Sequence, residues 1–238
     1  MEQKNHLEME TKEKCTEEFN RNHFVFLKIE KVLMEETKPS KKLNEYSKTD
    51  EFKNSIFHML NRMKSTEQSK QHHPEGNVWI HTMMVVDEAA KLRDKSKDQR
   101  VFMWSAMLHD IGKPEVTRVR KGKITAYDHD KVGAIATKEI LIKACKDVTF
   151  IERVSAMVRW HMQILFIAKN MAFADIAAMK NEVDVEEVAL LGMCDRLGRL
   201  GVKREDVMRD ISKFQHMIEL LDDNCSVRKI LKHKSCTR

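Results

Sequence analysis

Apolar residues recur at helical spacing along most of the chain and divide it into amphipathic segments. Residues 1–18 are polar and acidic and have no core pattern, which predicts disorder. A helix is predicted over 19–36, a loop over 38–50 and another helix over 51–64. The residues predicted to face inward on the first of these helices are Phe24, Leu27, Ile29, Val32 and Leu33.

The pattern predicts a core of further helices over about 77–202, followed by a helix over 205–222. The inward face of the last helix is predicted to carry Val207, Ile211, Phe214, Ile218 and Leu221. Two short β-prone runs, 116–120 and 123–127, flank Lys121-Gly122 and predict a hairpin. We therefore divide the chain into a disordered N-terminus, a helical appendage, the core, and a C-terminal helix with a basic tail, over 1–18, 19–72, 73–204 and 205–238.

Composition favours helices over strands. Only 3 prolines and 7 glycines occur in 238 residues, which leaves little turn material for a β-rich fold. Leu, Met, Glu, Lys and Ala are abundant, and all of them favour helices. The expected fold class is all-α, with one short β-hairpin.

Several predicted helices place a metal-binding type of side chain on their apolar face. These residues are His81, the neighbouring pair His109-Asp110, His129, His161 and Asp195. A buried polar group without a partner is costly, so each of them needs a partner in the core. A single buried histidine is usually explained by a hydrogen bond to a backbone carbonyl. The recurrence of such groups on five helices favours a buried metal site instead.

The ordered series of motifs resembles the HD-domain family of metal-dependent phosphohydrolases. The resemblance is closer still to the HD domain of bacterial CCA-adding tRNA nucleotidyltransferases, and it covers about residues 40–205. It implies a helical bundle around a metal site. The segments that carry it are HPEGNVWIHTMMVVDEAA (73–90), LHDIGKP (108–114), YDHDKVGA (127–134), VRWHM (158–162) and DRLGR (195–199).

The resemblance also implies a ligand set. His81, His109, Asp110 and Asp195 match the ligands of a first metal. His129 and His161 match positions that hold a second ion in two-metal members, with Asp110 bridging, or that contact substrate in others. Nitrogen and oxygen ligands of this kind suit one or two ions of Mn, Fe, Co, Ni or Zn.

Some branches of the family are excluded by their motifs. Alarmone hydrolases carry two acidic residues shortly after the His-Asp pair, whereas this chain reads HDIGKP. Cyclic-di-GMP phosphodiesterases carry a Gly-Tyr-Pro signature that is missing here. The polymerase domain of a CCA-adding enzyme needs a Gly-Ser loop, but residues 1–75 contain no glycine. We therefore expect an HD module without the polymerase.

The expected reaction is phosphoester hydrolysis by metal-activated water. The candidate catalytic residues are Asp110, as a metal ligand, and Lys113, as a cation that pairs with a phosphoryl oxygen. The alternative for Lys113 is that it offsets the negative end of the helix dipole. Related proteins act on 2′,3′-cyclic phosphates and on 2′- or 3′-nucleotides, so the expected substrate is a small nucleotide or an RNA 3′-end. The alternatives are a 5′-nucleotidase, a dinucleoside polyphosphate hydrolase, or a non-catalytic sensor that binds a nucleotide.

The charge of the chain is compatible with RNA binding but does not require it. The net charge is +6 and the pI is about 9.0. Basic residues are concentrated in the predicted hairpin and in the tail 227–238. The hairpin cations Arg118, Arg120, Lys121 and Lys123 are candidate contacts for substrate phosphates, although a solvated hairpin without a role explains them equally well.

The remaining features concern location. The 5 cysteines are scattered without a C-x-x-C pair, and the N-terminus has no signal-like apolar run. No apolar stretch approaches the length that crosses a bilayer, so no membrane association is expected. We expect a cytoplasmic protein with reduced thiols. The sequence does not indicate an oligomeric state.

Overall fold

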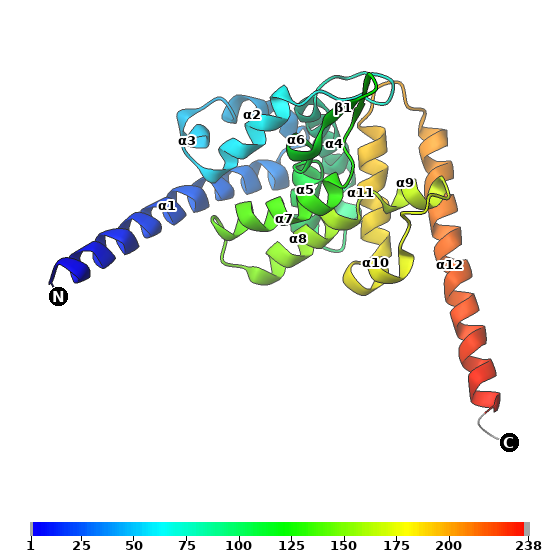
Figure 1. The fold of residues 1–238 in the computed structure, drawn as a ribbon. Coiled ribbons are helices and arrows are strands. Elements are labelled where there is room, and N and C mark those ends of the chain that lie inside the picture. The colour runs from blue at the N-terminus through cyan, green and yellow to red at the C-terminus, as the bar shows by residue number, and fades with distance from the viewer. Residues whose placement is uncertain (1, 236–238) are drawn as a thin grey trace.

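Helix α5 (Gln99–Leu108) lies at the centre of the computed structural model, in contact with α1, α4, α8 and α11 (Figure 1). The structure describes the backbone of residues 2–235 and the side chains of residues 14–221. Every residue from Val101 to Leu108 is buried, which is typical of a helix that has neighbours on all sides. The all-α class with one hairpin is confirmed for the described part of the chain.

The N-terminal region is more helical than the pattern predicts. Its elements are α1 (Glu2–Glu35), α2 (Pro39–Tyr46), α3 (Asp50–Lys53) and the 3₁₀-helix η1 (Ile56–Ser65). Helix α1 begins at Glu2 rather than residue 19, and no proline or glycine interrupts residues 2–35. The prediction of a loop over 38–50 was wrong where α2 forms, because Pro39 suits the first turn of a helix.

Two further predictions for this region need correction. The helix predicted over 51–64 is divided in two, because the Ser55 hydroxyl accepts a hydrogen bond from the Phe57 amide and caps a new helix. On α1, Phe24 and Leu27 are exposed, whereas Val25 and Phe26 are buried. The inward face is set by contact with α5, where the Phe26 ring stacks on Trp104.

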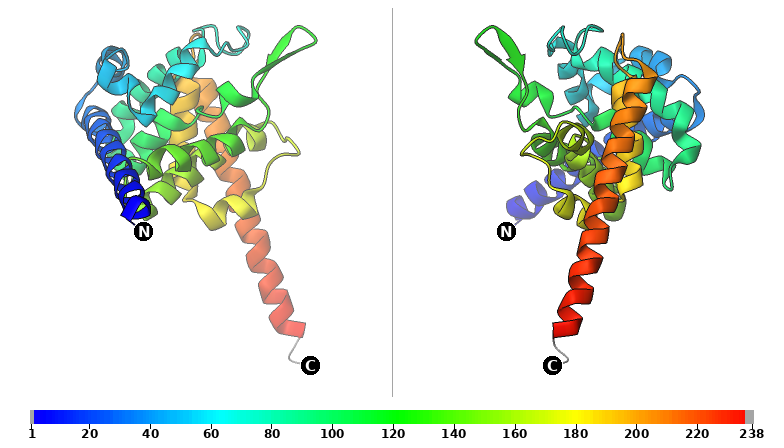
Figure 2. Two further views of the ribbon diagram at one scale, coloured as in Figure 1. Left: turned by 60° about the vertical axis from the view of Figure 1, so that its left-hand side comes forward. Right: turned by 90° about the vertical axis from the view of Figure 1, so that its right-hand side faces the viewer.

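The rest of the bundle consists of helices that pack pairwise. These are α4 (Val78–Leu92), η2 (Arg93–Lys95), α6 (Lys113–Val116), α7 (His129–Ile142), α8 (Val148–Trp160), α9 (Gln163–Ala168), α10 (Ile176–Glu182), α11 (Val185–Leu197) and α12 (Arg204–Ser235). Helix α7 packs on α8, α11 on α4, and α12 on α9 and α11. Parts of α1 and α12 extend beyond the bundle (Figure 2).

The inward face predicted for the last helix is confirmed at Val207, Ile211, Phe214 and Ile218, but Leu221 is exposed. Helix α12 begins at Arg204 and runs past residue 222. The basic side chains of the tail 227–238 lie outside the described residues. None of the helices in the described part of the chain is both long enough and apolar enough to cross a membrane.

The predicted hairpin is present and projects from the bundle (Figure 2). Strand β1 (Arg118–Arg120) pairs antiparallel with β2 (Lys123–Thr125). Lys121 and Gly122 form the two-residue turn, and both have positive φ, as a type I′ turn requires.

Two glycines allow close approach between the elements that carry the buried polar groups. A methyl group at Gly112 would lie 2.2 Å from the carbonyl oxygen of His129, so glycine brings the segment after Asp110 against the start of α7. A methyl group at Gly198 would lie 2.9 Å from the backbone nitrogen of Val85, at the contact between α11 and α4. Both contacts are between elements that the sequence predicts to carry metal ligands.

Candidate metal centre

The structure brings all six sequence-predicted ligand residues into one buried cluster. His81 lies within α4, His109 and Asp110 follow α5, His129 begins α7, His161 follows α8 and Asp195 lies in α11. None of the six is more than 7% exposed. The cluster therefore joins the ends or inner faces of five helices.

The first group of ligand atoms surrounds the imidazole of His81. Its Nε2 lies 2.9 Å from Asp195 Oδ1 and 3.9 Å from Asp110 Oδ2. Nε2 of His109 lies 3.2 Å from the same Asp110 oxygen. The ligand atoms of His81, His109 and Asp110 lie within 4.8 Å of one another, so the three could hold one ion, with Asp195 beside them.

The second group lies on the other side of Asp110. Its Oδ1 is 3.4 Å from Nε2 of His129. The ligand atoms of Asp110, His129 and His161 again lie within 4.8 Å of one another. Asp110 thus belongs to both groups, with Oδ2 near the first and Oδ1 near the second.

Hydrogen bonds prepare three of the histidines to bind a metal through Nε2. Nδ1 of His109, His129 and His161 donates to the carbonyl oxygen three residues earlier, at 2.9, 2.8 and 2.7 Å. Because Nδ1 carries the proton, Nε2 of a neutral ring has a free lone pair. Among the described residues, Nε2 of His109 and of His129 is buried and has no hydrogen-bond partner. Buried imidazole nitrogens and carboxylate oxygens of this kind are suitable ligands for a divalent transition metal.

The fourth histidine, His81, has a carboxylate partner instead. Glu75 Oε1 lies 2.9 Å from Nδ1 of His81 and 2.9 Å from Nδ1 of His73. Burial favours a raised pKa for Glu75, but the contact with His81 and other hydrogen bonds outweigh burial and lower this pKa to about 2. Glu75 is therefore ionised at neutral pH. A carboxylate behind a metal-ligating histidine orients the ring and makes it a stronger ligand.

The charges of the cluster suit cation binding. Burial would raise the pKa of Asp110, but attraction to Lys113 and His109 outweighs burial and holds this pKa well below its usual value. The pKa of Asp195 is held low in the same way by Arg199 and His81, against the effect of burial. For His161, burial and then the nearby His129 and His109 lower the pKa to about 3. The carboxylates are thus ionised and His161 is neutral, as ligation requires.

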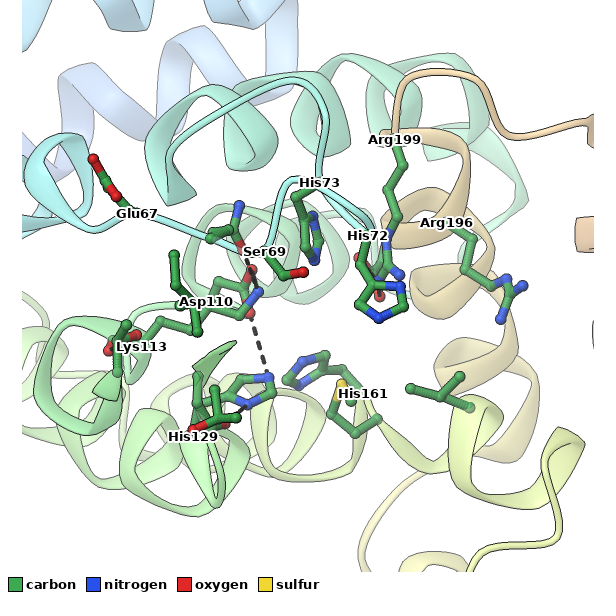
Figure 3. A pocket seen from close by; sticks show the side chains of 18 of the residues that line it. Glu67, Ser69, His72, His73, Asp110, Lys113, His129, His161, Arg196 and Arg199 are labelled. Atoms are coloured by element: carbon green, nitrogen blue, oxygen red, sulfur yellow. Dashed lines mark hydrogen bonds and ion pairs between the residues drawn. The ribbon is translucent and has the colours of Figure 1, made fainter. Parts of the chain in front are cut away.

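The cluster opens into a cavity of about 480 Å³, which is in the size range that holds a small organic ligand (Figure 3). Asp110, His129, His161 and Asp195 line it. Lys113 also lines it, and its ammonium lies 2.6 Å from Asp110 Oδ2 and 2.6 Å from the amide oxygen of Gln68.

The hairpin meets this cavity through β2 and not through its cations. Ile124, Thr125 and Ala126 are among the lining residues. The four predicted phosphate contacts, Arg118, Arg120, Lys121 and Lys123, are exposed and are not among them. Position along the hairpin accounts for this, since Arg120 and Lys123 pair next to the turn at its projecting end, whereas Thr125 lies at the other end of β2. Arg120 instead lies over the ring of Tyr127, 5.3 Å from its centroid.

Sequence reasoning missed several polar residues of the site. Glu75 lies in a turn without periodicity, and only the quoted HPEG segment marked its position. Arg199 follows Asp195 by one helical turn and its Nη2 lies 2.9 Å from both carboxylate oxygens, so the i, i+4 spacing in DRLGR was an available signal. Gln68 and Arg196 also line the cavity, and neither was recognised.

Comparison with known proteins identifies the fold. The HD domain family profile matches residues 78–200, more than half of the chain, and this range contains the whole cluster. The protein belongs to the HD domain family. HD domains are generally metal-dependent hydrolases that bind divalent metals, and the buried histidines and aspartates fit such a site.

Several curated proteins are similar in sequence to part of this HD domain protein. The following three are each named multifunctional CCA protein. The protein of Actinobacillus pleuropneumoniae serotype 5b is 33% identical over 58 residues, 24% of this chain and 14% of its own length. The protein of Halorhodospira halophila is 34% identical over 98 residues, which are 40% of this chain and 21% of that protein. The protein of Methylococcus capsulatus is 24% identical over 155 residues, which are 63% of this chain and 30% of that protein. The chain thus aligns with less than a third of each of these relatives.

Proposed function

We propose that this HD domain protein hydrolyses phosphoesters of nucleotides or RNA ends, as a 2′,3′-cyclic phosphodiesterase or nucleotidase. The observation that carries the proposal is the pair of ligand groups that share Asp110 and open into a cavity beside Lys113. A cavity of about 480 Å³ accommodates a nucleotide-sized substrate. The partial similarity to multifunctional CCA proteins supports an RNA-end or nucleotide substrate.

The proposed roles follow from position. His81, His109, Asp110 and Asp195 would hold a first metal, and Asp110, His129 and His161 a second. The chemistry that such metals supply is Lewis acidity, which activates water and offsets negative charge on a phosphoryl group. The metal could be Mn, Fe, Co, Ni or Zn, because all of them accept this mixed ligand set.

The chain's own residues complete the site. Gln68 accepts a hydrogen bond from the Lys113 ammonium and so fixes it at the cavity wall beside Asp110, where it can pair with a non-bridging phosphoryl oxygen. The carbonyl oxygens of Ala106, Ala126 and Val158 hold three imidazoles in the ligating tautomer. Glu75 orients His81 from the side away from Asp195.

The test is turnover by purified protein supplied in turn with Mn²⁺, Co²⁺, Ni²⁺, Fe²⁺ and Zn²⁺. The substrates are 2′,3′-cyclic AMP, 2′-AMP, 3′-AMP, 5′-AMP and diadenosine tetraphosphate, with products separated by chromatography. We expect metal-dependent turnover of the cyclic or the 2′- and 3′-phosphates, which Asp110→Asn abolishes and Glu139→Gln, on the exposed side of α7, leaves intact.

The other outcomes identify the alternatives. Preferred turnover of 5′-AMP or diadenosine tetraphosphate would assign a 5′-nucleotidase or a dinucleoside polyphosphate hydrolase. Binding of a nucleotide without turnover in any metal would make the protein a sensor and overturn the proposal.

A further inference from the structure

Positive charge lines the cavity on two sides. Lys113 lies beside the metal cluster, whereas Arg196 and Arg199 lie on the other side of the pocket in Figure 3. Lys169, the residue that ends α9, also lines the cavity. One phosphate held at Lys113 and the metal ligands would therefore leave this second group of cations without a substrate anion. In the described part of the chain, Arg199 then pairs only with Asp195 and Arg196 only with Asp210, both carboxylates of the protein itself.

Arg196 is held from behind the cavity. Its Nη2 lies 2.6 Å from Asp210 Oδ2 on α12, and Asp210 is not among the lining residues. The salt bridge thus fixes the guanidinium without adding a carboxylate to the cavity wall. An arginine carries five N–H donors, so one salt bridge leaves most of them available.

Unpaired donors are concentrated on the same cavity. Among the described residues, Nε of Arg196, Nε of Arg199 and Nε2 of Gln68 are buried without a hydrogen-bond partner. All three residues line the cavity. Gln68 contacts Lys113, whereas the two arginine donors lie on the Arg196 side. A buried donor without an acceptor is costly, so the two arginines indicate a ligand that brings acceptor oxygens to that side.

We propose that the Arg196 side of the cavity, formed by Arg196 and Arg199, binds a second phosphate group of the substrate, with Lys169 of the cavity lining as a further cation. This inference rests on the proposed function and narrows its substrate to a nucleotide that carries a further phosphate. That phosphate is either a free 5′-phosphate or the phosphodiester that joins the terminal nucleotide to an RNA chain. A nucleoside monophosphate would leave this side of the cavity empty.

The experiment compares the binding of three ligands by titration calorimetry. These are adenosine 3′-monophosphate, adenosine 3′,5′-bisphosphate and the dinucleotide ApAp, each added to chelator-treated and to Mn²⁺-loaded protein, with ligand integrity checked by chromatography. We expect the second phosphate to tighten binding about 10-fold or more, because hydrogen bonds to a charged group are stronger than those between neutral groups. A gain for both larger ligands assigns an RNA end, and a gain for the bisphosphate alone assigns a free nucleotide.

The variants are Lys169→Ala and Arg196→Gln, with Lys138→Ala and Arg153→Gln as matched controls. Lys138 and Arg153 also form salt bridges, with Glu152 and Asp98, but neither lines the cavity. At least one of the two cavity variants should lose the gain from the second phosphate while the affinity for the monophosphate is retained. If Arg196→Gln fails to fold, exposed Lys169 decides alone.

The second phosphate subsite is overturned if wild-type protein binds all three ligands equally, binds none of them, or keeps its preference in every folded cavity variant. These outcomes are separate from those of the proposed function. Tighter binding of the bisphosphate with no turnover of any substrate would retain the subsite and refute the enzyme. Turnover without a preference for ligands with two phosphates would retain the enzyme and refute the second phosphate subsite.

Discussion

Glu75 offers the sharpest test of how the metal centre is built. Its side chain is 1% exposed, and Oε1 lies 2.9 Å from the Nδ1 atoms of both His73 and His81. Its other oxygen accepts a hydrogen bond from the Leu200 amide. Glu75→Gln keeps the shape and one acceptor oxygen but removes the charge behind His81.

We expect Glu75→Gln to weaken metal binding by about 10- to 100-fold, the usual effect of losing such a partner of a ligand. This corresponds to about 1.4–2.7 kcal/mol. The full charge is lost, because the low pKa of Glu75, about 2, keeps the carboxylate ionised at neutral pH. The effect should be confined to the ion beside His81, since His129 and His161 are oriented by backbone carbonyls that the substitution does not touch.

The assay is competition for Mn²⁺, Ni²⁺ or Zn²⁺ against a chelating indicator, combined with elemental analysis of bound metal. The matched control is Glu67→Gln, which removes the same charge from an exposed residue at the cavity without contact to a described histidine. Equal affinity in wild type and Glu75→Gln, or an equal loss in both variants, would refute an orienting role for Glu75. Glu75 would then be a structural residue of the turn.

Four further predictions concern the other site residues. Purified protein should contain one or two equivalents of transition metal by elemental analysis, and His109→Ala or Asp195→Ala should remove metal and lower the melting temperature, because the remaining buried ligands lose their cation. His129→Ala and His161→Ala should each reduce the content to about one equivalent with little turnover left; unchanged content with weaker substrate binding would instead make them substrate contacts. Lys113→Ala should lower kcat/KM by about 100-fold, or about 2.7 kcal/mol, in steady-state kinetics. Its metal content should not fall, because the substitution removes a cation beside Asp110. Replacing Arg118, Arg120, Lys121 and Lys123 with Ser should spare turnover of a mononucleotide, because none of them lines the cavity; a loss that appears only with RNA oligomers, with a flatter salt dependence, would assign them to RNA binding.

The helices and their buried polar positions were largely predictable because periodicity is a local property. Each of the six cluster residues was correctly placed on an inward face. The hairpin followed from two β-prone runs around Lys121-Gly122. Prediction failed where neighbouring elements decide the outcome, as at Phe24 and Leu27, because the contact of Phe26 with Trp104 sets the buried face of α1.

The sequence by itself determined which chemistry is buried in the helical core, since the six cluster residues follow from residue type and helical phase. Only the tertiary structure decided which of them meet. Asp110 belongs to both ligand groups because helices distant along the chain pack closely at Gly112 and Gly198. The same packing brings Arg196 to the cavity and leaves the hairpin cations outside it. Distances between side chains on different helices depend on how whole elements pack, and no local pattern contains that information.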